Sequence, residues 1–576
     1  MQFFATRRSF LGVPAADDYD YLYWLRFHPF TLFDSMGSLD YWRPVGRQLY
    51  YVVVAPVLFR APWLVALLHG ALLLLVFALI FRVARRGFPA PVAASIAAFP
   101  ILAEPLRALL IWPTGGEYLL ALAFTALAVH ECVHGRPLTC ALSCLAALAS
   151  HEASALALIA VPAIVWRRGG RAEGLRWLAW MTGVGLVWFV GHQLAHARGA
   201  GWLAAGSAAS LPSRFGLAFT RSVVAQLNLE DAPRVTATLV WVLYAALGVA
   251  AGWIFARDRS ARARVRRHPA PILAALAWFA LGLVAVSLLL PEWNAWRTAL
   301  PGLWLGVVTA GFLGALRPSL AVALLVVRLA TLAIATPAPA TLVGRMPVSP
   351  STRSFQHVTR FQRAADGVRR ELLGRYPTLP RGTSVRYWSR PRGTAISLVG
   401  SKAIDVWYGD STLTWDWVWS NDDILPGDNP VLGFDHNSDR VAILLEPAAL
   451  AAAREGNVAM RAGRWAAADS LFEIAVRAQS RNPCHQFISW LLKCQTIGAL
   501  RFEQYARAES LNTLYYGHVG DTGDWYGFDA VFALHRGDPS RAARSARRCL
   551  EENPRNEFGL LVLESLRRGP VVTPSR

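Results

Sequence analysis

Long apolar stretches recur through the first 336 residues, and they constrain the fold of this chain more than any other feature. Residues 61–83 form one such stretch, and about 20 apolar residues are what a helix needs to cross the roughly 30 Å hydrocarbon core of a bilayer. Every backbone polar group must be satisfied inside the bilayer, so such segments are helical. The sequence therefore predicts a polytopic helical membrane domain with about ten spans. These spans cover residues 61–83, 89–111, 117–133, two short arms within 137–166, 175–196, 235–256, 271–290, 301–316 and 320–336.

Arginine-rich turns separate the apolar stretches and orient them. The net charge of +20 comes almost entirely from arginine, because Lys402 and Lys493 are the only lysines. Basic residues in short loops mark the cytoplasmic side of a membrane protein, so we attribute the charge to topology and expect no nucleic-acid partner. The map puts both chain termini outside and predicts that a first span is missing before Met1. The predicted inner turns hold Arg82, Arg85 and Arg86, then Arg136, then Arg167, Arg168 and Arg171, then residues 257–267, and finally Arg317.

One apolar stretch, residues 137–166, has basic residues on both sides and must therefore turn back on itself. Each arm of this hairpin would have roughly 14 residues, or about 21 Å of helix, which is shorter than the hydrocarbon core. The tip carries His151 and Glu152. We expect this tip to lie in a recess open to the outer side, because charged groups at membrane depth are tolerated in such cavities.

The longest polar and aromatic stretch before the spans covers residues 17–51 and should lie outside. It opens with Asp17, Asp18 and Asp20 and closes with Asp40, Arg43 and Pro44. Three carboxylates so close together repel one another unless a cation, a metal or a mobile proton lies among them. A solvated loop or a helix N-terminus would also account for the cluster.

The last 240 residues differ in composition from the membrane half. Residues 337–352 form a proline-rich linker, and residues 353–447 predict a small α/β module with a helix at 354–375 and strands at 383–388, 395–399 and 440–445. Residues 448–568 have the spacing of small and large residues that is typical of tetratricopeptide (TPR) repeats, although ordinary α-hairpins give almost the same pattern. The first copy contains Gly456, Gly463, Trp465, Ala468, Phe472 and Ala475, and the second contains Gly537, Ala542, Ala546, Cys549 and Pro554.

The membrane half resembles the GT-C superfamily of polyprenyl-phosphate-dependent glycosyltransferases, in particular bacterial relatives of the transmembrane-and-TPR-containing O-mannosyltransferases. Two departures are a histidine, His151, where the family has a lysine, and the missing first span. The matching positions, in chain order, are Asp17–Asp18, Tyr41, Arg43, Pro44, His69, Pro100, Glu104, Glu117, His151–Glu152 and Arg297.

The resemblance implies an integral-membrane hexosyltransferase of the cytoplasmic (inner) membrane, with its C-terminal domain outside. It would transfer a sugar from a polyprenyl-phosphate donor to a hydroxyl on a protein or glycan acceptor. Asp17 or Asp18 would be the catalytic base. No cofactor is certain, although a divalent metal would fit the reaction, and the TPR-like repeats could bind a protein partner. The candidate substrate-binding residues are Arg43, Glu104, Glu117, His151, Glu152 and Arg297.

Several alternatives to these expectations remain open at the level of sequence. An O-antigen polymerase or ligase shares the multispan topology, and a non-catalytic membrane scaffold could present a TPR domain. Glu104 and Glu152 could instead form buried ion pairs between helices. His69 is better explained as a satisfied intramembrane histidine than as a catalytic group, and Arg43 as readily by an anchor to lipid headgroups as by phosphate binding.

Overall fold

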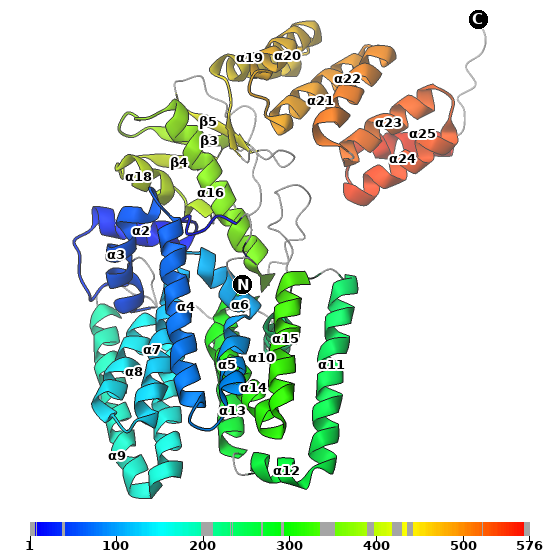
Figure 1. Cartoon of the computed structure of the whole chain (residues 1–576). Coiled ribbons are helices and arrows are strands. Elements are labelled where there is room, and N and C mark those ends of the chain that lie inside the picture. Colours follow the sequence, from blue (N-terminus) through cyan, green and yellow to red (C-terminus); the bar gives the residue numbers. More distant parts are fainter. Residues whose placement is uncertain are drawn as a thin grey trace, which may run out of the picture. The chain divides into compact units, whose positions relative to one another are not determined.

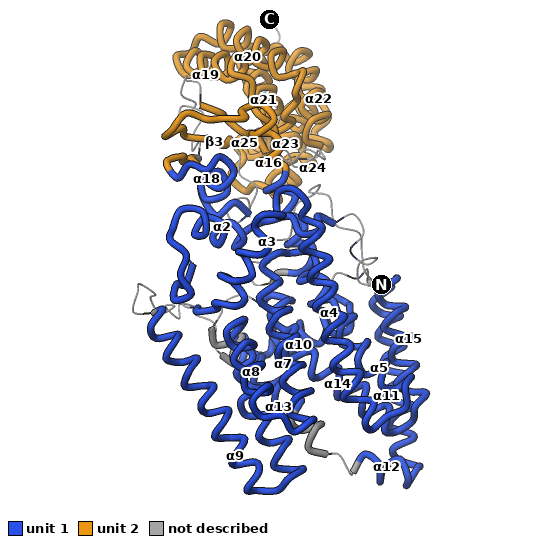
Figure 2. The backbone as a smooth tube through the Cα atoms, turned by 60° about the vertical axis from the view of Figure 1, so that its left-hand side comes forward, with its two compact units in different colours: residues 1–340, 347–366, 395–411 blue, residues 341–346, 367–394, 412–576 orange. Residues whose placement is uncertain are grey.

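The computed structural model covers 576 residues and falls into two compact units, coloured separately in Figure 2. Unit 1 comprises Met1–Ala340, Pro347–Asp366 and Ala395–Ser411, and unit 2 comprises Thr341–Met346, Gly367–Thr394 and Thr412–Arg576. The structure describes all residues except 1–5, 7–8, 37–40, 197–210, 231, 233, 267–268, 290–292, 335–351, 389–396, 418–428, 435–441, 521 and 569–576.

Unit 1 is a helical bundle, as the sequence predicts (Figure 1). Among the described residues, five helices are long and apolar enough to cross a membrane, and a sixth is counted if α5 (Ala90–Ile101) and α6 (Glu104–Ile111), bent by 64°, are one broken span. The five are α4 (Trp63–Ala84), α7 (Gly115–Val133), α9 (Ala157–His196) with the turn before it, α11 (Arg234–Arg257), and α14 (Ala299–Leu316) with the turn before it.

The count differs from the ten predicted spans because several of those spans are short or continuous with a neighbour. Two of them form the short helices α8 (Pro137–Ser150) and α15 (Pro318–Ile334), with 14 and 17 residues. A third forms α13 (Pro269–Leu289), of which only the part Ala275–Val284 is fully described. Two others lie end to end in α9, which contains one non-helical residue, Gly170, with φ 84° and ψ −178°. This break separates residues 157–169 from 171–196 at the predicted basic turn.

The predicted hairpin at residues 137–166 is confirmed. Its first arm, α8, has 14 residues, and a short 3₁₀ turn, η2 (Glu152–Leu156), connects it to α9. Cys140, Cys144 and Leu148 of α8 pack against Val161 and Val165 of α9 in one apolar cluster. The three cysteines of the membrane half are free and buried, as expected for small core residues.

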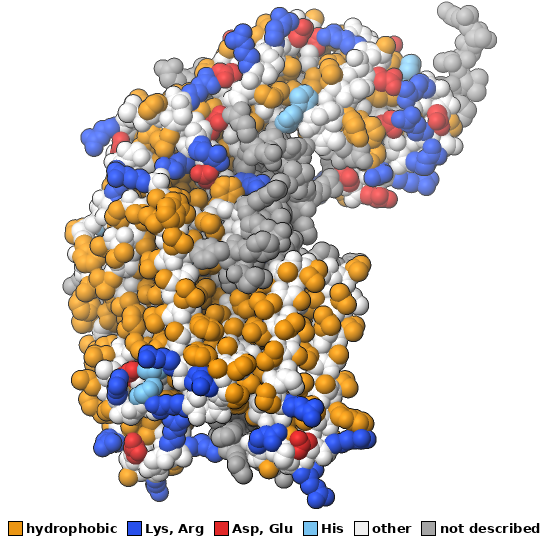
Figure 3. All heavy atoms as spheres, viewed as in Figure 1, with side chains coloured by type: hydrophobic (Ala, Val, Ile, Leu, Met, Phe, Trp, Pro, Cys, Tyr) orange, Lys and Arg blue, Asp and Glu red, His pale blue; other side chains and the backbone are white. Residues whose placement is uncertain are grey.

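The basic turns gather at one end of unit 1. Arg86 Nη1 donates to the carbonyl oxygen of Val133 at 2.7 Å, which joins the turn after α4 to the turn after α7. Arg264 of α12 (Arg259–Arg266) donates to the carbonyl oxygens of Ala315 and Leu316 at 2.9 Å. Figure 3 shows this end as a concentration of arginine below a broad apolar surface. The opposite ends of the same helices carry the candidate site residues.

The acidic cluster begins a helix, α2 (Asp17–Phe27), rather than a solvated loop. Carboxylates in a first turn favour helix formation, because they complement the partial positive charge of the helix N-terminus. After Pro44 the chain forms a π-helical turn, η1 (Val45–Leu49), that continues into α3 (Tyr50–Leu58). Asp40 lies outside the described residues.

Two segments from beyond residue 340 belong to unit 1, so the predicted module at 353–447 is divided between the units. One is the first part of α16 (Phe355–Arg375), where Gln362 Nε2 donates to the carbonyl oxygens of Val13 and Ile111 at 2.7 and 2.9 Å. The other contains α18 (Lys402–Tyr408), whose Lys402 forms an ion pair with Asp20. Arg26 Nη1 also donates to the Val406 carbonyl oxygen at 2.7 Å. The first unit also contains the strand pair β1 (Trp293–Asn294) and β2 (Thr352–Arg353).

Unit 2 contains a four-stranded sheet in the order β4-β3-β5-β6. The strands are β3 (Ser384–Trp388), β4 (Thr414–Trp417), β5 (Val431–Phe434) and β6 (Ala442–Leu444); β3 pairs in parallel with β4 and β5, and β5 pairs antiparallel with β6. The predicted strands at 383–388 and 440–445 are found. The one at 395–399 is wrong, because Ser397 and Leu398 are helical and residues 395–396 lie outside the described part. The linker at 337–352 also lies outside it, except for Thr352.

Seven helices follow the sheet, and neighbouring helices pack through the small residues that the sequence singled out. A Cβ on Gly456 would lie 2.7 Å from the Phe472 ring, so glycine is needed for this close approach. Ala468 and Ala475 are buried at the same contact. The assignment as TPR repeats stays a prediction. The helices are α19 (Pro447–Arg461), α20 (Trp465–Gln479), α21 (His485–Arg501), α22 (Tyr505–Val519), α23 (Gly523–His535), α24 (Pro539–Glu552) and α25 (Glu557–Arg568).

Candidate active-site cavity

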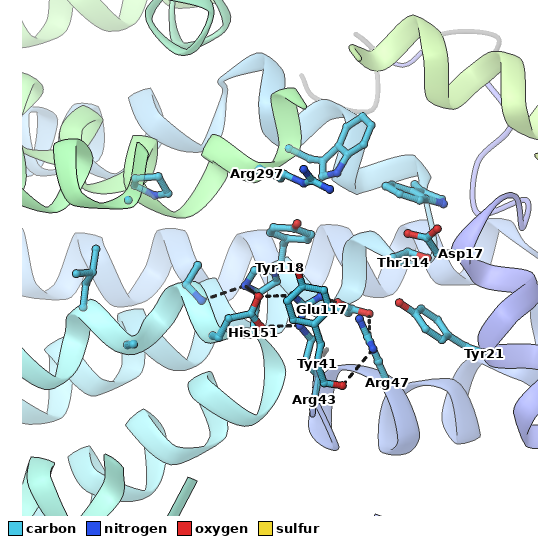
Figure 4. A pocket seen from close by; sticks show the side chains of 18 of the residues that line it. Asp17, Tyr21, Tyr41, Arg43, Arg47, Thr114, Glu117, Tyr118, His151 and Arg297 are labelled. Atoms are coloured by element: carbon cyan, nitrogen blue, oxygen red, sulfur yellow. Dashed lines mark hydrogen bonds and ion pairs between the residues drawn. The ribbon is translucent and has the colours of Figure 1, made fainter. Parts of the chain in front are cut away.

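A cavity of about 380 Å³ opens in unit 1, at the end of the bundle opposite to α12. Its walls come from segments that are far apart in the sequence: α2, η1, the start of α7, the α8–α9 tip, α13 and the start of α14. Figure 4 draws 18 of the lining side chains and labels ten of them. The lining residues are Asp17, Asp20, Tyr21, Tyr41, Arg43, Arg47, Trp112, Thr114, Glu117, Tyr118, His151, Glu152, Ala153, Ala155, Leu156, Trp278, Leu281, Gly282, Trp296, Arg297 and Pro301.

Two arginines and two glutamates form a connected ion-pair network in the cavity wall. Arg43 pairs with Glu117 and makes a two-pronged contact with Glu152, in which Nε donates to Oε2 at 2.7 Å. Arg47 Nε donates to the other oxygen of Glu117 at 2.8 Å. Planar guanidinium groups suit this two-point recognition of carboxylates. The network joins η1, the first turn of α7 and the hairpin tip.

Close backbone packing makes this network possible. Gly46 lies in η1 against the end of α8, where a Cβ would come within 2.5 Å of the Ser150 carbonyl oxygen. Any larger residue at position 46 would push η1, and with it Arg47, away from the hairpin tip. Gly116 has the same role beside the Tyr50 ring, which a Cβ would approach to 2.4 Å.

Asp17 is the carboxylate at the cavity surface that has no partner of its own. Within the described part of the chain it makes no hydrogen bond or ion pair, and it is exposed in the cavity. The protein around it reduces its solvation, and the neighbouring charges of Asp20 and Glu117 add to this, so its pKa is raised above the usual value of 3.8. Arg47 and Arg297 oppose the rise. The raised pKa makes this carboxylate a better proton acceptor than an ordinary aspartate.

Asp18 points away from the cavity and has a structural role instead. Its carboxylate accepts hydrogen bonds from the Ala15 amide at 2.7 Å, the Thr114 amide at 2.8 Å, the Thr114 hydroxyl at 2.6 Å and the Trp112 indole at 3.0 Å, and from the Tyr51 hydroxyl. It is fully buried. Its oxygens are occupied by donors that fix α2 to α3 and to the turn before α7, so Asp17 is the stronger of the two candidates for the base.

The hairpin tip and the turn before α14 complete the polar part of the cavity. His151 accepts a hydrogen bond at Nδ1 from the Ala153 amide at 3.1 Å, and its ring lies 4.2 Å from the Tyr118 ring, centroid to centroid. Its buried Nε2 has no partner among the described residues. Arg297 comes from the 3₁₀ turn η3 (Ala295–Thr298), on the opposite wall from Arg43 in Figure 4.

Glu104 does not reach the cavity. It forms a buried ion pair with Arg107 one turn along α6, and its backbone amide donates to the Asn228 side-chain oxygen at 2.7 Å. Glu104 thus takes part in a buried ion pair, but the pair lies within α6 and not between helices, as the alternative had proposed. His69 is likewise a satisfied buried histidine, with Nε2 2.7 Å from the Tyr50 hydroxyl. The ion pairs of Arg43 with glutamates rule out a headgroup anchor as its main contact.

Some of the residues that line the cavity were not predicted from the sequence. Arg47 follows Arg43 by four residues, a helical spacing that could have predicted a shared face. The aromatic residues Tyr21, Trp112, Tyr118, Trp278 and Trp296 gave no signal, because aromatic residues are common throughout the chain. Among the described residues, no group of three or more His, Cys, Asp or Glu side chains could hold a metal ion.

Comparison with known proteins gives no assignment: no protein-family model, no curated protein and no solved structure matches the chain.

Proposed function

We propose that this chain is a membrane-embedded glycosyltransferase of the GT-C type, which transfers a sugar from a polyprenyl phosphate to a hydroxyl acceptor. The observation that carries the proposal is the unpartnered Asp17 carboxylate in a cavity that also exposes arginine. Sugar transfer to a hydroxyl needs a base for the acceptor proton and positive charge for the departing phosphate. Asp17 supplies the first, and Arg297, Arg43 and Arg47 are available for the second.

The lining of the cavity suits the two parts of such a donor. It includes the polar residues Asp17, Arg43, Glu117, Glu152 and Arg297. It also includes apolar residues of α13, α14 and the hairpin tip, namely Ala155, Leu156, Trp278, Leu281, Gly282 and Pro301. A phosphate-linked sugar would contact the polar residues, and the start of a polyprenyl chain the apolar ones. Aromatic side chains with a few polar groups between them are typical of small-molecule sites.

The proposed reaction balances as a simple displacement. The acceptor oxygen attacks the anomeric carbon of the sugar while Asp17 takes the hydroxyl proton. The bond between that carbon and the phosphate oxygen breaks, and polyprenyl phosphate leaves with the electron pair. Guanidinium groups stabilise the charge that develops on the leaving phosphate. Glu117 and Glu152 hold Arg43 and Arg47 in place and orient them toward the cavity.

The test compares two adjacent carboxylates. Full-length protein in membranes is incubated with radiolabelled undecaprenyl-phosphate hexoses, and transfer of the label to endogenous acceptors is measured. Asp17→Asn should lower the transfer rate by about 10²–10⁴-fold, the usual loss when a general base is removed, with an unchanged melting temperature. Asp18→Asn should act mainly on stability, because the Asp18 side chain is buried and does not itself line the cavity.

Transfer at the wild-type rate by Asp17→Asn would contradict the assignment of the base. A scaffold without catalytic activity would need no unpartnered carboxylate in a cavity, and it predicts no transfer by any variant or by the wild type. The outer-face location of the cavity, the inner-membrane location and a protein partner for the helical repeats belong to the same proposal.

A further inference from the structure

A buried arginine in the bundle has no counter-ion among the described residues. Arg328 lies in α15 and is 0% exposed, yet Nε and Nη1 of its guanidinium have no hydrogen-bond partner among the described residues. The guanidinium instead packs on an aromatic ring, and its carbon lies 4.1 Å above the centre of the Phe99 ring of α5. Neither residue lines the cavity.

Burial of a guanidinium without a counter-ion costs free energy unless an anion is bound next to it. A charge removed from water requires a partner of opposite charge or several hydrogen bonds, and a cation–π contact replaces only a part of the lost hydration. Ionisable groups within membrane helices accordingly have partners and usually serve a function. An anion bound at Arg328 would therefore stabilise its guanidinium.

A second unpartnered donor comes from the neighbouring helix α11. The buried hydroxyl of Tyr244 has no hydrogen-bond partner within the described residues, and it is close enough to Arg328 for their charges to interact. Helices α11 and α15 are neighbours in the bundle (Figures 1 and 2). A phosphate oxygen is the kind of acceptor that can bind a guanidinium and a hydroxyl together.

The helix that carries Tyr244 offers room for a chain below such a phosphate. Gly248 and Gly252 follow Tyr244 at intervals of four residues, so all three lie along one side of α11. A Cβ on either glycine would meet nothing within 4 Å. Large apolar side chains on the rest of α11, including Val235, Val242 and Trp253, are exposed, as on a helix that faces lipid.

We propose that Arg328 and Tyr244 form a binding site for the phosphate of a lipid, whose chain lies along the Gly248–Gly252 side of α11. Arg328 is six residues, or about 9 Å, from the end of α15, so the phosphate would be drawn below the level of the helix ends. A bilayer phospholipid and a polyprenyl phosphate share this chemistry. The site goes beyond the proposed function and does not depend on it.

The experiment measures stabilisation of the full-length, delipidated protein in detergent by added lipids. Phosphatidylglycerol and undecaprenyl phosphate are compared with diacylglycerol, which has acyl chains but no phosphate. One or both phosphate lipids should raise the wild-type melting temperature, and diacylglycerol should not. Stabilisation by phosphatidylglycerol alone would assign a bilayer phospholipid, and stabilisation by undecaprenyl phosphate alone a polyprenyl phosphate.

Single substitutions test whether the lipid phosphate binds at Arg328 and Tyr244. Arg328→Leu should weaken the apparent affinity for the phosphate lipid about 10- to 100-fold, the range for a lost charged hydrogen-bonding pair. Arg317→Leu removes an exposed arginine next to the start of the same helix and should leave the affinity unchanged. Tyr244→Phe removes a single hydroxyl and should weaken the affinity about 2- to 10-fold. This variant still tests the site if Arg328→Leu does not fold.

Two results would overturn the site. Equal stabilisation by diacylglycerol would mean that only the chain is bound. An unchanged response in both Arg328→Leu and Tyr244→Phe would mean that the phosphate binds elsewhere, and for undecaprenyl phosphate that result would point to the cavity.

Discussion

The adjacent aspartates Asp17 and Asp18 in α2 have different environments, although the sequence alone gives no reason to distinguish them. A residue at position i and the next one point about 100° apart around a helix, so one of two neighbours can face a cavity while the other faces the core. Asp17 is exposed in the cavity, and Asp18 is buried against Tyr51, Trp112 and Thr114. Only the packing of the turn before α7 on α2 decides which one faces which way.

Asp18 should make the stability of the protein depend on pH. Burial raises its pKa from 3.8 to about 7, against the opposing hydrogen bonds from Thr114, Tyr51 and Ala15. The folded state therefore binds more protons than the unfolded state between these values, so the contribution of Asp18 to stability is full below pH 4 and is lost as the pH rises through 7. The loss is on the order of 4 kcal/mol.

Thermal melts of wild type and Asp18→Asn between pH 4 and 8 test this prediction. Subtraction of the variant removes the contributions of all other groups. The stability of the wild type relative to Asp18→Asn should be greatest near pH 4, should fall toward pH 7 and should then level off. A difference that is constant, or that grows with pH, would contradict the pKa of Asp18.

At the scale of elements, the break in α9 determines how the short hairpin fits the membrane. Without it, residues 157–196 would form a single helix of about 60 Å, twice the thickness of the hydrocarbon core. Gly170 takes a backbone conformation that only glycine adopts readily and lets the chain reverse at the basic turn. The hairpin tip, with His151 and Glu152, consequently lies at the cavity.

A substitution at this break should destabilise the protein. Gly170→Ala forces a Cβ into a conformation with φ 84°, and it should cost about 1–3 kcal/mol of stability. Gly183→Ala is the matched control in the same helix, because a Cβ there meets nothing within 4 Å and alanine favours helix by about 0.5–1 kcal/mol. Melting temperatures in one detergent measure both. A Gly170→Ala variant that is as stable as Gly183→Ala would show that α9 continues through position 170.

At the scale of the whole molecule, the two ends of unit 1 differ in charge and in role. One end carries the arginine-rich turns, and the other carries the cavity. The positive-inside rule predicts that the arginine-rich end faces the cytoplasm. The donor lipid of the proposed reaction would then approach the cavity from the outer leaflet.

Labelling of single introduced cysteines tests this orientation. Ser260→Cys lies in α12, and Leu32→Cys lies on the loop after α2, both at exposed positions. All six native cysteines are buried and should not react. An impermeant maleimide added to intact cells should label Leu32→Cys and spare Ser260→Cys until the cells are permeabilised. The reverse pattern would invert the predicted topology.

The sequence by itself determined the features that depend on local composition. Apolar length fixed the helical class, basic residues between spans fixed the turns, and the two basic flanks of residues 137–166 fixed the hairpin. These features follow from the free-energy cost of placing a charged group or an unpaired backbone N–H or C=O group in lipid. Each segment incurs that cost independently of the other segments. Side-chain partners are a different matter, because they depend on which helices pack together.

Only the tertiary structure decided the membership of the site. It separated Asp17 from Asp18, paired Glu104 with Arg107, and brought Arg47 of η1 to Glu117 of α7 across 70 residues of sequence. It also assigned α18 to the membrane unit through Lys402 and Asp20, whereas composition alone predicted a separate module. Contacts of this range arise from close packing of glycine-lined surfaces, such as Gly46 on Ser150, and no local pattern in the sequence encodes them.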